Sequence, residues 1–203
     1  MILILGVPGT GKSTYALQRA VELGRAPAYL LAHDPGYRLP TRLPDGRTVI
    51  LHRHATLEQG KRALERDPRG VHAFAVADGE QVLRLGAEVA EASLAKHAGQ
   101  KGHPVVVVLD EGVGTAGASA YRLGDTLRES LALRRHRHVG VLMTAQDPRL
   151  VHYALGGLAT EIVLFRVHDR QALDKLARLG VSPAELDRVP QLPNFRHIVC
   201  KLG

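Results

Sequence analysis

Three stretches of this sequence carry side chains whose types and spacing suit chemistry on a phosphate ester. The first, GVPGTGKST, fits the pattern G-x-x-x-x-G-K-[ST]. Glycines at these spacings let backbone N–H groups wrap closely around phosphate oxygens. Lys12 is expected to bring positive charge to the β- and γ-phosphates, and Ser13 a hydroxyl ligand for Mg²⁺. The residues expected to bind ATP are Gly6, Val7, Pro8, Gly9, Thr10, Gly11, Lys12, Ser13 and Thr14.

The second stretch, VVVVLDE, places two carboxylates directly after an apolar run. Ligands of open α/β sheets bind beyond the carboxyl ends of the strands, which is where these side chains would lie. We expect Asp110 to hold Mg²⁺ through its water shell and Glu111 to orient and polarise an attacking water. The alternative is a pair of solvated acids that only end a strand. The adjacent pair favours hydrolysis, because a phosphotransferase must keep water away from the γ-phosphate.

The third stretch, LRRHRHVGVLMTAQDP, leads from basic residues through an apolar strand to Gln146. If this strand lies beside the VVVVL strand, Gln146 reaches the same edge and can sense the bound nucleotide. An amide suits that task because it donates and accepts hydrogen bonds without carrying charge. The basic residues at the opposite end of the strand could reach a neighbouring subunit's phosphate, or could form a solvated helix end. They are Arg134, Arg135 and Arg137.

Short apolar runs alternate with helical stretches, which is typical of a mainly parallel sheet flanked by helices. Strands are expected at residues 2–5, 28–32, 48–52, 71–76, 105–109, 139–144, 161–166 and 195–200. Helices are expected at residues 12–23, 57–66, 79–98, 119–133, 171–179 and 183–189. SPAEL is a clear helix start, with Ser182 as N-cap and Pro183 at the first helical position. The absence of repeats and linkers predicts one α/β domain over residues 1–203.

The bulk composition is that of a globular protein, and it narrows the class of partner. The chain has 203 residues, a formal net charge of +7 and a pI near 9.9. That charge fits a polyanionic partner, although an arginine-rich composition from a GC-rich genome gives the same number. No apolar run reaches the roughly 20 residues of a membrane helix, and the start MILIL lacks the basic residues of a signal peptide. The single cysteine, Cys200, excludes an internal disulfide and fits a cytosolic protein.

Taken in order, these motifs resemble the FtsK–HerA superfamily of DNA-pumping ATPases. The resemblance rests on the phosphate-binding loop (P-loop), the strand ending in DE, the arginine-rich turn, TAQDP, FRVHD and the closing LPNF. Family members carry an arginine 11 positions before the glutamine, which selects Arg135 (146 − 135 = 11) as the arginine finger. The family typically ends this strand in TQ.P, whereas an alanine intervenes here. Residues 26–102 carry no motif that matches.

The resemblance implies a RecA/FtsK-like P-loop NTPase fold whose C-terminal strand can run antiparallel. A core this short is most similar to the genome-packaging ATPases of membrane-containing icosahedral viruses. This resemblance implies a ring, often a hexamer, that drives double-stranded DNA into a capsid, with ATP and Mg²⁺ as cofactors. The implied setting is the host cytoplasm or the virion, with capsid vertex or inner-membrane proteins as partners.

Three alternatives remain open from the sequence. Filamentous-phage assembly ATPases share the RH and TQ region but normally add a membrane helix. Small-molecule kinases often carry a P-loop near the N-terminus, although Glu111 and Gln146 argue against that class. A non-catalytic assembly factor is disfavoured by the intact set of Lys12, Asp110 and Glu111.

Two further features could concern a metal or a nucleotide. The sequence HRH occurs at residues 52–54 and 136–138, and alternating residues of a strand share a face, so each pair could chelate zinc. Solvated or phosphate-contacting histidines are the favoured interpretation, since no cysteine or carboxylate accompanies them. Asp34, in AHDPGYR, could approach the nucleotide, but a turn is favoured there.

Overall fold

The computed structural model describes residues 1–32, 41–67, 70–75, 78–94, 103–112, 128 and 139–202. Within these ranges the strands form an eight-stranded sheet in the order β3-β4-β2-β5-β6-β1-β7-β8. The strands are β1 (Ile2–Leu5), β2 (Gly24–Ala32), β3 (Leu51–His54), β4 (Val71–Phe74), β5 (His103–Leu109), β6 (Val139–Ala145), β7 (Glu161–Leu164) and β8 (Ile198–Lys201). All neighbouring strands are parallel except β7 and β8. The predicted α/β class is confirmed, and the C-terminal strand runs antiparallel, as the family resemblance allows.

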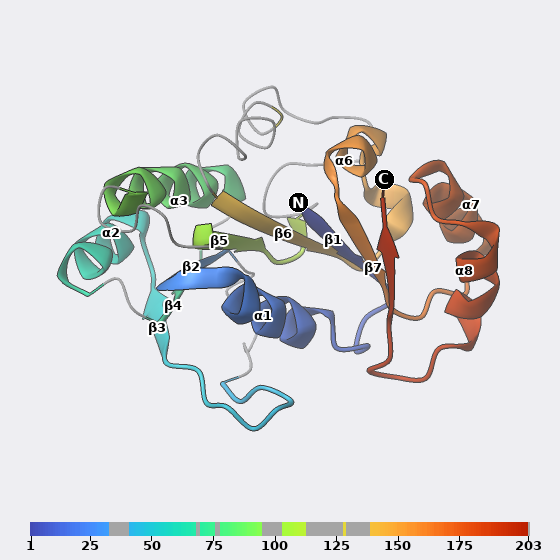
Figure 1. Cartoon of the computed structure of the whole chain (residues 1–203), viewed down its shortest axis with the longest axis horizontal. Helices are drawn as coiled ribbons and strands as arrows, with labels where there is room; N and C mark the ends of the chain where they lie inside the picture. The colour runs from blue at the N-terminus through green and yellow to red at the C-terminus, as the bar shows by residue number, and fades with distance from the viewer. Residues whose placement is uncertain are drawn as a thin grey trace.

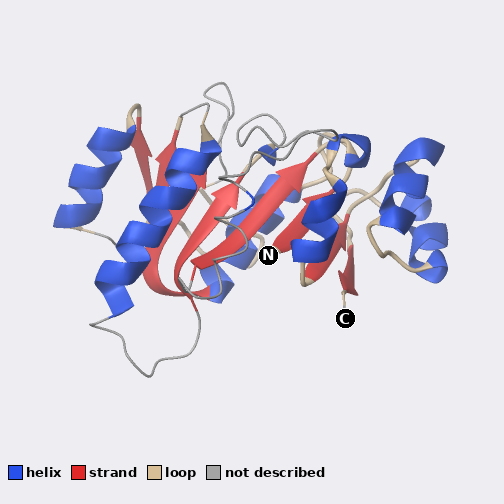
Figure 2. Ribbon diagram, turned by 90° about the horizontal axis from the view of Figure 1, so that it is seen from above, coloured by secondary structure: helices blue, strands red, loops and turns tan. Residues whose placement is uncertain are grey.

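Helices cover both faces of the twisted sheet (Figures 1 and 2). The helices are α1 (Lys12–Leu23), α2 (Leu57–Arg66), α3 (Gly79–Leu94), α6 (Tyr153–Leu158), α7 (Arg170–Arg178) and α8 (Pro183–Arg188), with short 3₁₀ turns η1 (Pro148–Leu150) and η2 (Val189–Gln191). Alternate residues of each strand serve opposite faces. Ile4 packs in one apolar cluster with Ala16 of α1, whereas Leu3 and Leu5 pack in another with α3, α6 and α7. The sheet therefore carries α1 on one side and α2, α3 and α6 on the other.

Two predicted strands are displaced, each for a local reason. The strand predicted at residues 48–52 begins at Leu51, because Thr48 forms an isolated antiparallel bridge with Arg42 instead of joining the sheet. The strand predicted at residues 195–200 begins at Ile198, because Phe195 has a left-handed backbone with φ of 63°. That conformation breaks an extended strand.

The helix signals are read more reliably than the strand ends. The helices predicted at residues 12–23 and 57–66 have those bounds. Ser182 and Glu185 form the predicted capping box at the start of α8. Helix α6, with sequence YALGGL, was not predicted, since two adjacent glycines hide any helical pattern. The helix predicted at residues 119–133 lies outside the described residues, apart from Arg128.

Candidate nucleotide and metal site

The three chemistry-bearing stretches meet at the carboxyl ends of adjacent strands. Strand β6 pairs in parallel with both β5 and β1, as predicted for β5. Leu5 aligns with Ala145, and Leu109 with Met143. The P-loop, the acidic pair and the glutamine therefore leave the sheet at the same edge. This is the edge at which ligands bind in open α/β sheets.

The P-loop depends on glycine at two positions where the backbone is close to other atoms. Gly6 has φ of 154°, and a Cβ placed there would lie 2.6 Å from the Cβ of Phe165. Gly11 is the N-cap of α1 in a left-handed conformation, with φ of 98° and no side-chain cap. The first N–H groups of α1 therefore have no capping side chain and can bind an anion. Pro8 and Gly9 form the exposed tip of the loop, and Thr14 lies in the first turn of α1.

Backbone hydrogen bonds fix the P-loop onto the neighbouring strands. The Gly6 N–H donates to the Ala145 carbonyl at 3.3 Å, and the Val7 N–H donates to the Arg166 carbonyl at 3.1 Å. The Thr10 hydroxyl closes the loop on itself by donating to the Val7 carbonyl at 2.8 Å. These bonds hold the loop before any phosphate binds, which lowers the ordering cost of binding.

Lys12 is folded back over the loop. Its Nζ donates to the Val7 carbonyl at 3.0 Å, and the residue is only 5% exposed. Burial lowers the pKa of Lys12, while the nearby Glu111 and Asp110 oppose that shift. A buried ammonium gains from anionic contacts, so bound phosphate would relieve the desolvation that burial imposes.

The Asp110 carboxylate is the centre of a small oxygen-rich group. The Ser13 hydroxyl donates to Asp110 Oδ1 at 3.0 Å, and the buried Thr144 hydroxyl donates to the same oxygen at 2.7 Å. Mg²⁺ prefers hard oxygen ligands and is usually bound by one or two carboxylates together with substrate phosphates. The paired oxygens of Ser13 and Asp110, both proposed from the sequence as metal ligands, fit such an ion. The partner Thr144 was missed, although a hydroxyl inside an apolar strand two residues before Gln146 is a usable signal.

Glu111 is held in an unusual backbone conformation beside this group. Its φ is 52°, and its N–H donates to Thr144 Oγ1 at 2.8 Å. Burial raises the pKa of Glu111, against hydrogen bonds from the side chain and backbone of Gln146 and the charge of Lys12. Gln146 therefore reaches the same site, as its place in the sequence indicates. A carboxyl with a raised pKa beside a lysine is the kind of group that accepts protons in active sites.

Several sequence-predicted residues lie outside the described part of the chain. They are Asp34, Arg134, Arg135, His136, Arg137 and His138. Among the described residues, His52, His54 and His72 form a stack on β3 and β4. His54 Nε2 and His72 Nδ1 are 3.0 Å apart and share one hydrogen bond. Across the described ranges no cluster of three or more His, Cys, Asp or Glu side chains could hold a metal.

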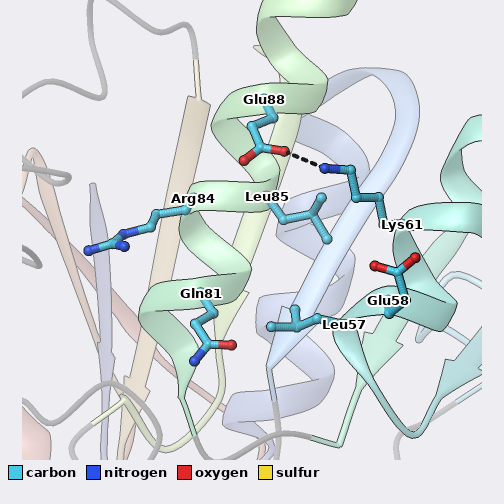
Figure 3. A pocket seen from close by; sticks show the side chains of 7 residues that line it. All are labelled: Leu57, Glu58, Lys61, Gln81, Arg84, Leu85 and Glu88. Carbon is cyan, nitrogen blue, oxygen red and sulfur yellow. Dashed lines mark hydrogen bonds and ion pairs between the residues drawn. The ribbon is translucent and has the colours of Figure 1, made fainter.

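A separate pocket lies between α2 and α3 (Figure 3). Leu57 and Leu85 form its apolar part, and Lys61 pairs with Glu88 at 3.3 Å. No P-loop residue and neither member of the acidic pair lines it. Its other charged residues, Glu58 and Arg84, pair with Arg62 and Glu80, so the pocket lacks the uncompensated positive charge that phosphate binding needs.

Within the described ranges, no helix is both long and apolar enough to cross a bilayer.

No protein-family model and no curated protein sequence matches this chain. Solved structures do match in fold. The genome packaging NTPase B204 of Sulfolobus turreted icosahedral virus 2, in complex with sulfate, has a TM-score of 0.71 at 13% identity, covering 99% of this chain and 90% of that one. B204 of Sulfolobus Turreted Icosahedral Virus, a DNA-packaging ATPase, has a TM-score of 0.62 at 17% identity, covering 98% and 91%. The chain therefore has the fold of these P-loop NTPases.

Proposed function

We propose that this chain hydrolyses ATP to move double-stranded DNA, and that the DNA is a viral genome driven into a capsid. The observation that carries the proposal is the meeting of the P-loop, Asp110, Glu111 and Gln146 at one edge of the sheet. The shared fold with two packaging NTPases supports it. So do the complexes of one of those proteins with AMP and ATP-gammaS.

In the proposed reaction, Lys12 leaves the Val7 carbonyl and contacts the β- and γ-phosphates. Ser13 and Asp110 would hold Mg²⁺, which would neutralise charge on the phosphates. A water attacks the γ-phosphorus as the bond to the ADP oxygen breaks, and the Glu111 carboxylate accepts the proton of that water. The hydrogen bonds from Gln146 orient the Glu111 carboxylate and favour its ionised form.

One experiment separates this function from its rivals. Phosphate release from ATP is measured with and without double-stranded DNA, and transfer to a panel of nucleosides is followed in parallel. The proposal expects release that DNA stimulates and no phosphorylated nucleoside. Phosphate transfer to a nucleoside would instead establish a small-molecule kinase. A rate of phosphate release that does not change when DNA is added would favour an assembly ATPase of the filamentous-phage type.

The DNA contact itself has a distinct signature. A motor must grip phosphates at every step, so binding should ignore base sequence and weaken steeply as salt is raised. The net charge of +7 supplies the required attraction. Titration of two duplexes of unrelated sequence at several salt concentrations measures both properties. A flat salt dependence or a preference for one sequence counts against a packaging motor.

We further propose a ring, often hexameric in such motors, in which Arg135 completes the neighbouring subunit's site. In that ring, Lys12→Ala removes the pocket and Arg135→Ala removes the finger. Each variant alone should be inactive, but a mixture should recover ATPase activity by pairing an intact pocket with an intact finger. Absence of recovery, with specific activity independent of protein concentration, would rule out the shared site. The proposed setting is the host cytoplasm or the virion, with capsid vertex or inner-membrane proteins as docking partners.

A further inference from the structure

An exposed aromatic side chain lies directly against the P-loop. Phe195 is 70% exposed, and its Cδ1 would be only 2.8 Å from a Cβ built on Gly11. The loop that carries it runs from η2 to β8 and passes beside the P-loop (Figure 1). The ring is therefore placed at the flank of the loop proposed to bind the phosphates, with its outer surface open to solvent.

The backbone holds this ring in place at a conformational cost. The Arg196 N–H donates to the Pro193 carbonyl at 3.1 Å, which makes residues 193–196 a tight turn. Phe195 occupies the third position of that turn with φ of 63°, a conformation that favours glycine or asparagine. An exposed ring gains little burial in return. Strain kept at such a position is a reason to look for a function.

Neighbouring aromatic rings fix the segment against α1. The His197 ring lies 4.4 Å from the Tyr15 ring and 5.3 Å from the Phe165 ring, measured between centroids. Tyr15 follows the P-loop in the first turn of α1, and Phe165 packs beneath Gly6. Through His197, the segment that bears Phe195 is therefore held against residues at both the start and the end of the P-loop.

We propose that Phe195 stacks on the base of the nucleoside triphosphate whose phosphates bind the P-loop. This inference rests on the proposed nucleotide site. A stacking ring reads the π-face that every base presents and makes no hydrogen bonds to base edges. It should therefore bind adenine and guanine nucleotides alike, and the substrate class is nucleoside triphosphates.

The test compares a nucleotide with its phosphates alone. Calorimetric affinities are measured for AMPPNP, GMPPNP and inorganic tripolyphosphate, each with Mg²⁺, on the full chain. Phe195→Ala should weaken both nucleotides by about 5- to 150-fold, the usual contribution of base–aromatic stacking. The affinity for tripolyphosphate should not change. Phe195→Tyr should keep the parent affinities, and Phe195→Leu should behave like Phe195→Ala because it restores bulk without a π-face.

Two further variants separate stacking from a structural role. Phe195→Gly relaxes the left-handed backbone, so it should unfold at a temperature no lower than the parent yet lose nucleotide affinity as Phe195→Ala does. Tyr153→Ala is the matched control. Tyr153 is also 70% exposed, but it stacks on His152 at α6, on the other face of the sheet from α1. Its loss should leave all three affinities unchanged.

Each other result overturns the inference in a recognisable way. Parent-like nucleotide affinity in Phe195→Ala and Phe195→Gly would show that the ring does not touch the base. An equal loss for tripolyphosphate would show that the ring shapes the P-loop instead. If the parent binds neither nucleotide nor tripolyphosphate, the proposed function itself fails and the stacking role fails with it. Nucleotide binding by the parent with no effect of Phe195 would leave the proposed function standing.

Discussion

This protein has two clusters of polar side chains, each formed between a pair of adjacent parallel strands. One pair of strands is central in the sheet, and the other is at its edge. Asp110 and Thr144 follow or end the central strands β5 and β6 beside the P-loop. His54 and His72 lie within β3 and β4 at the edge of the sheet. Both groups are buried and hydrogen-bonded internally.

The difference lies in what each group leaves available. The acidic group lies near Lys12, at the edge of the sheet where the phosphates are proposed to bind. The His54 and His72 rings share a hydrogen bond with each other, and the His54 ring packs on Phe74, so their clustering is explained without a ligand. Clustering of polar residues is therefore a weak sign of a site, whereas a place at the carboxyl end of a central strand is a strong one.

The largest expected effect comes from removing the positive charge of the site. Lys12→Ala should reduce ATP turnover to background and weaken nucleotide binding, because it removes the cationic side chain that lies over the loop. Phosphate release and calorimetry measure the two effects. Lys61→Ala is the control, since Lys61 pairs with Glu88 at the surface between α2 and α3. Turnover that survives in Lys12→Ala would place the chemistry elsewhere.

Glu111→Gln should retain ATP and lose hydrolysis by about 100- to 10,000-fold, the usual contribution of a general base. Burial raises the pKa of Glu111, so the parent's rate should fall on the acid side at a pH above the ordinary glutamate range.

The same rise in the pKa of Glu111 means that the folded state binds this proton more tightly than the unfolded state. Glu111→Gln should therefore gain stability over the parent as pH rises through the folded pKa, and gain none at low pH. Glu88→Gln, at the surface pocket, should change neither rate nor profile.

Thr144→Val tests the link between the Asp110 carboxylate and the backbone of Glu111. It preserves shape but removes the hydroxyl that accepts from the Glu111 N–H and that donates, together with Ser13, to Asp110 Oδ1. We expect a loss of about 1–3 kcal/mol in the free energy of unfolding, typical of a buried polar group left unpaired, and lower turnover. Denaturant unfolding and phosphate release measure both. Thr144→Ser keeps the hydroxyl and should behave much like the parent. Equal behaviour of the two variants would show that the hydroxyl contributes neither to stability nor to turnover.

The residues found from sequence are those whose signal is local. GVPGTGKST specifies a loop by itself, because its glycines, lysine and serine act within one turn of chain. Gln146 needed one further step, the expectation that β6 lies beside β5, which parallel-sheet patterning supplies.

The residues missed depend on contacts between distant segments. Thr144 gains its role by meeting Asp110, 34 positions earlier. Phe195 meets Gly11 only after β8 has folded back against β7. The start of β3 likewise depends on the bridge between Arg42 and Thr48, which no periodicity announces. Local sequence patterns do not predict contacts between distant segments, so these contacts become visible only in the folded structure.

Gln146→Ala should move the acid limb of the rate profile without abolishing the site. Its amide is one of the groups that hold down the pKa of Glu111, so its removal should shift the limb to still higher pH. The backbone N–H of residue 146 remains as a donor, which limits the shift. A pH profile of phosphate release measures it. Gln146→Asn shortens the amide reach and should fall between the parent and alanine, whereas an unmoved limb would mean that the amide does not govern Glu111.

The smallest expected effect tests the other side of the comparison, the histidine pair. Burial, with a lesser contribution from His52, lowers the pKa of His54, so the unfolded chain binds that proton more readily than the folded chain. The stability that depends on neutral His54 is fully present above the unfolded histidine pKa, near 6.5, and is lost as pH falls through that value toward the folded pKa. His54→Phe, which keeps a ring beside Phe74, should therefore flatten the fall in unfolding free energy between neutral and mildly acidic pH. It should leave phosphate release per folded molecule unchanged, because β3 and β4 lie at the edge of the sheet, with β2 between them and the strands that lead into the P-loop and the acidic pair. A change in turnover at neutral pH would mean that the two polar groups are coupled across the sheet, and the contrast between them would no longer hold.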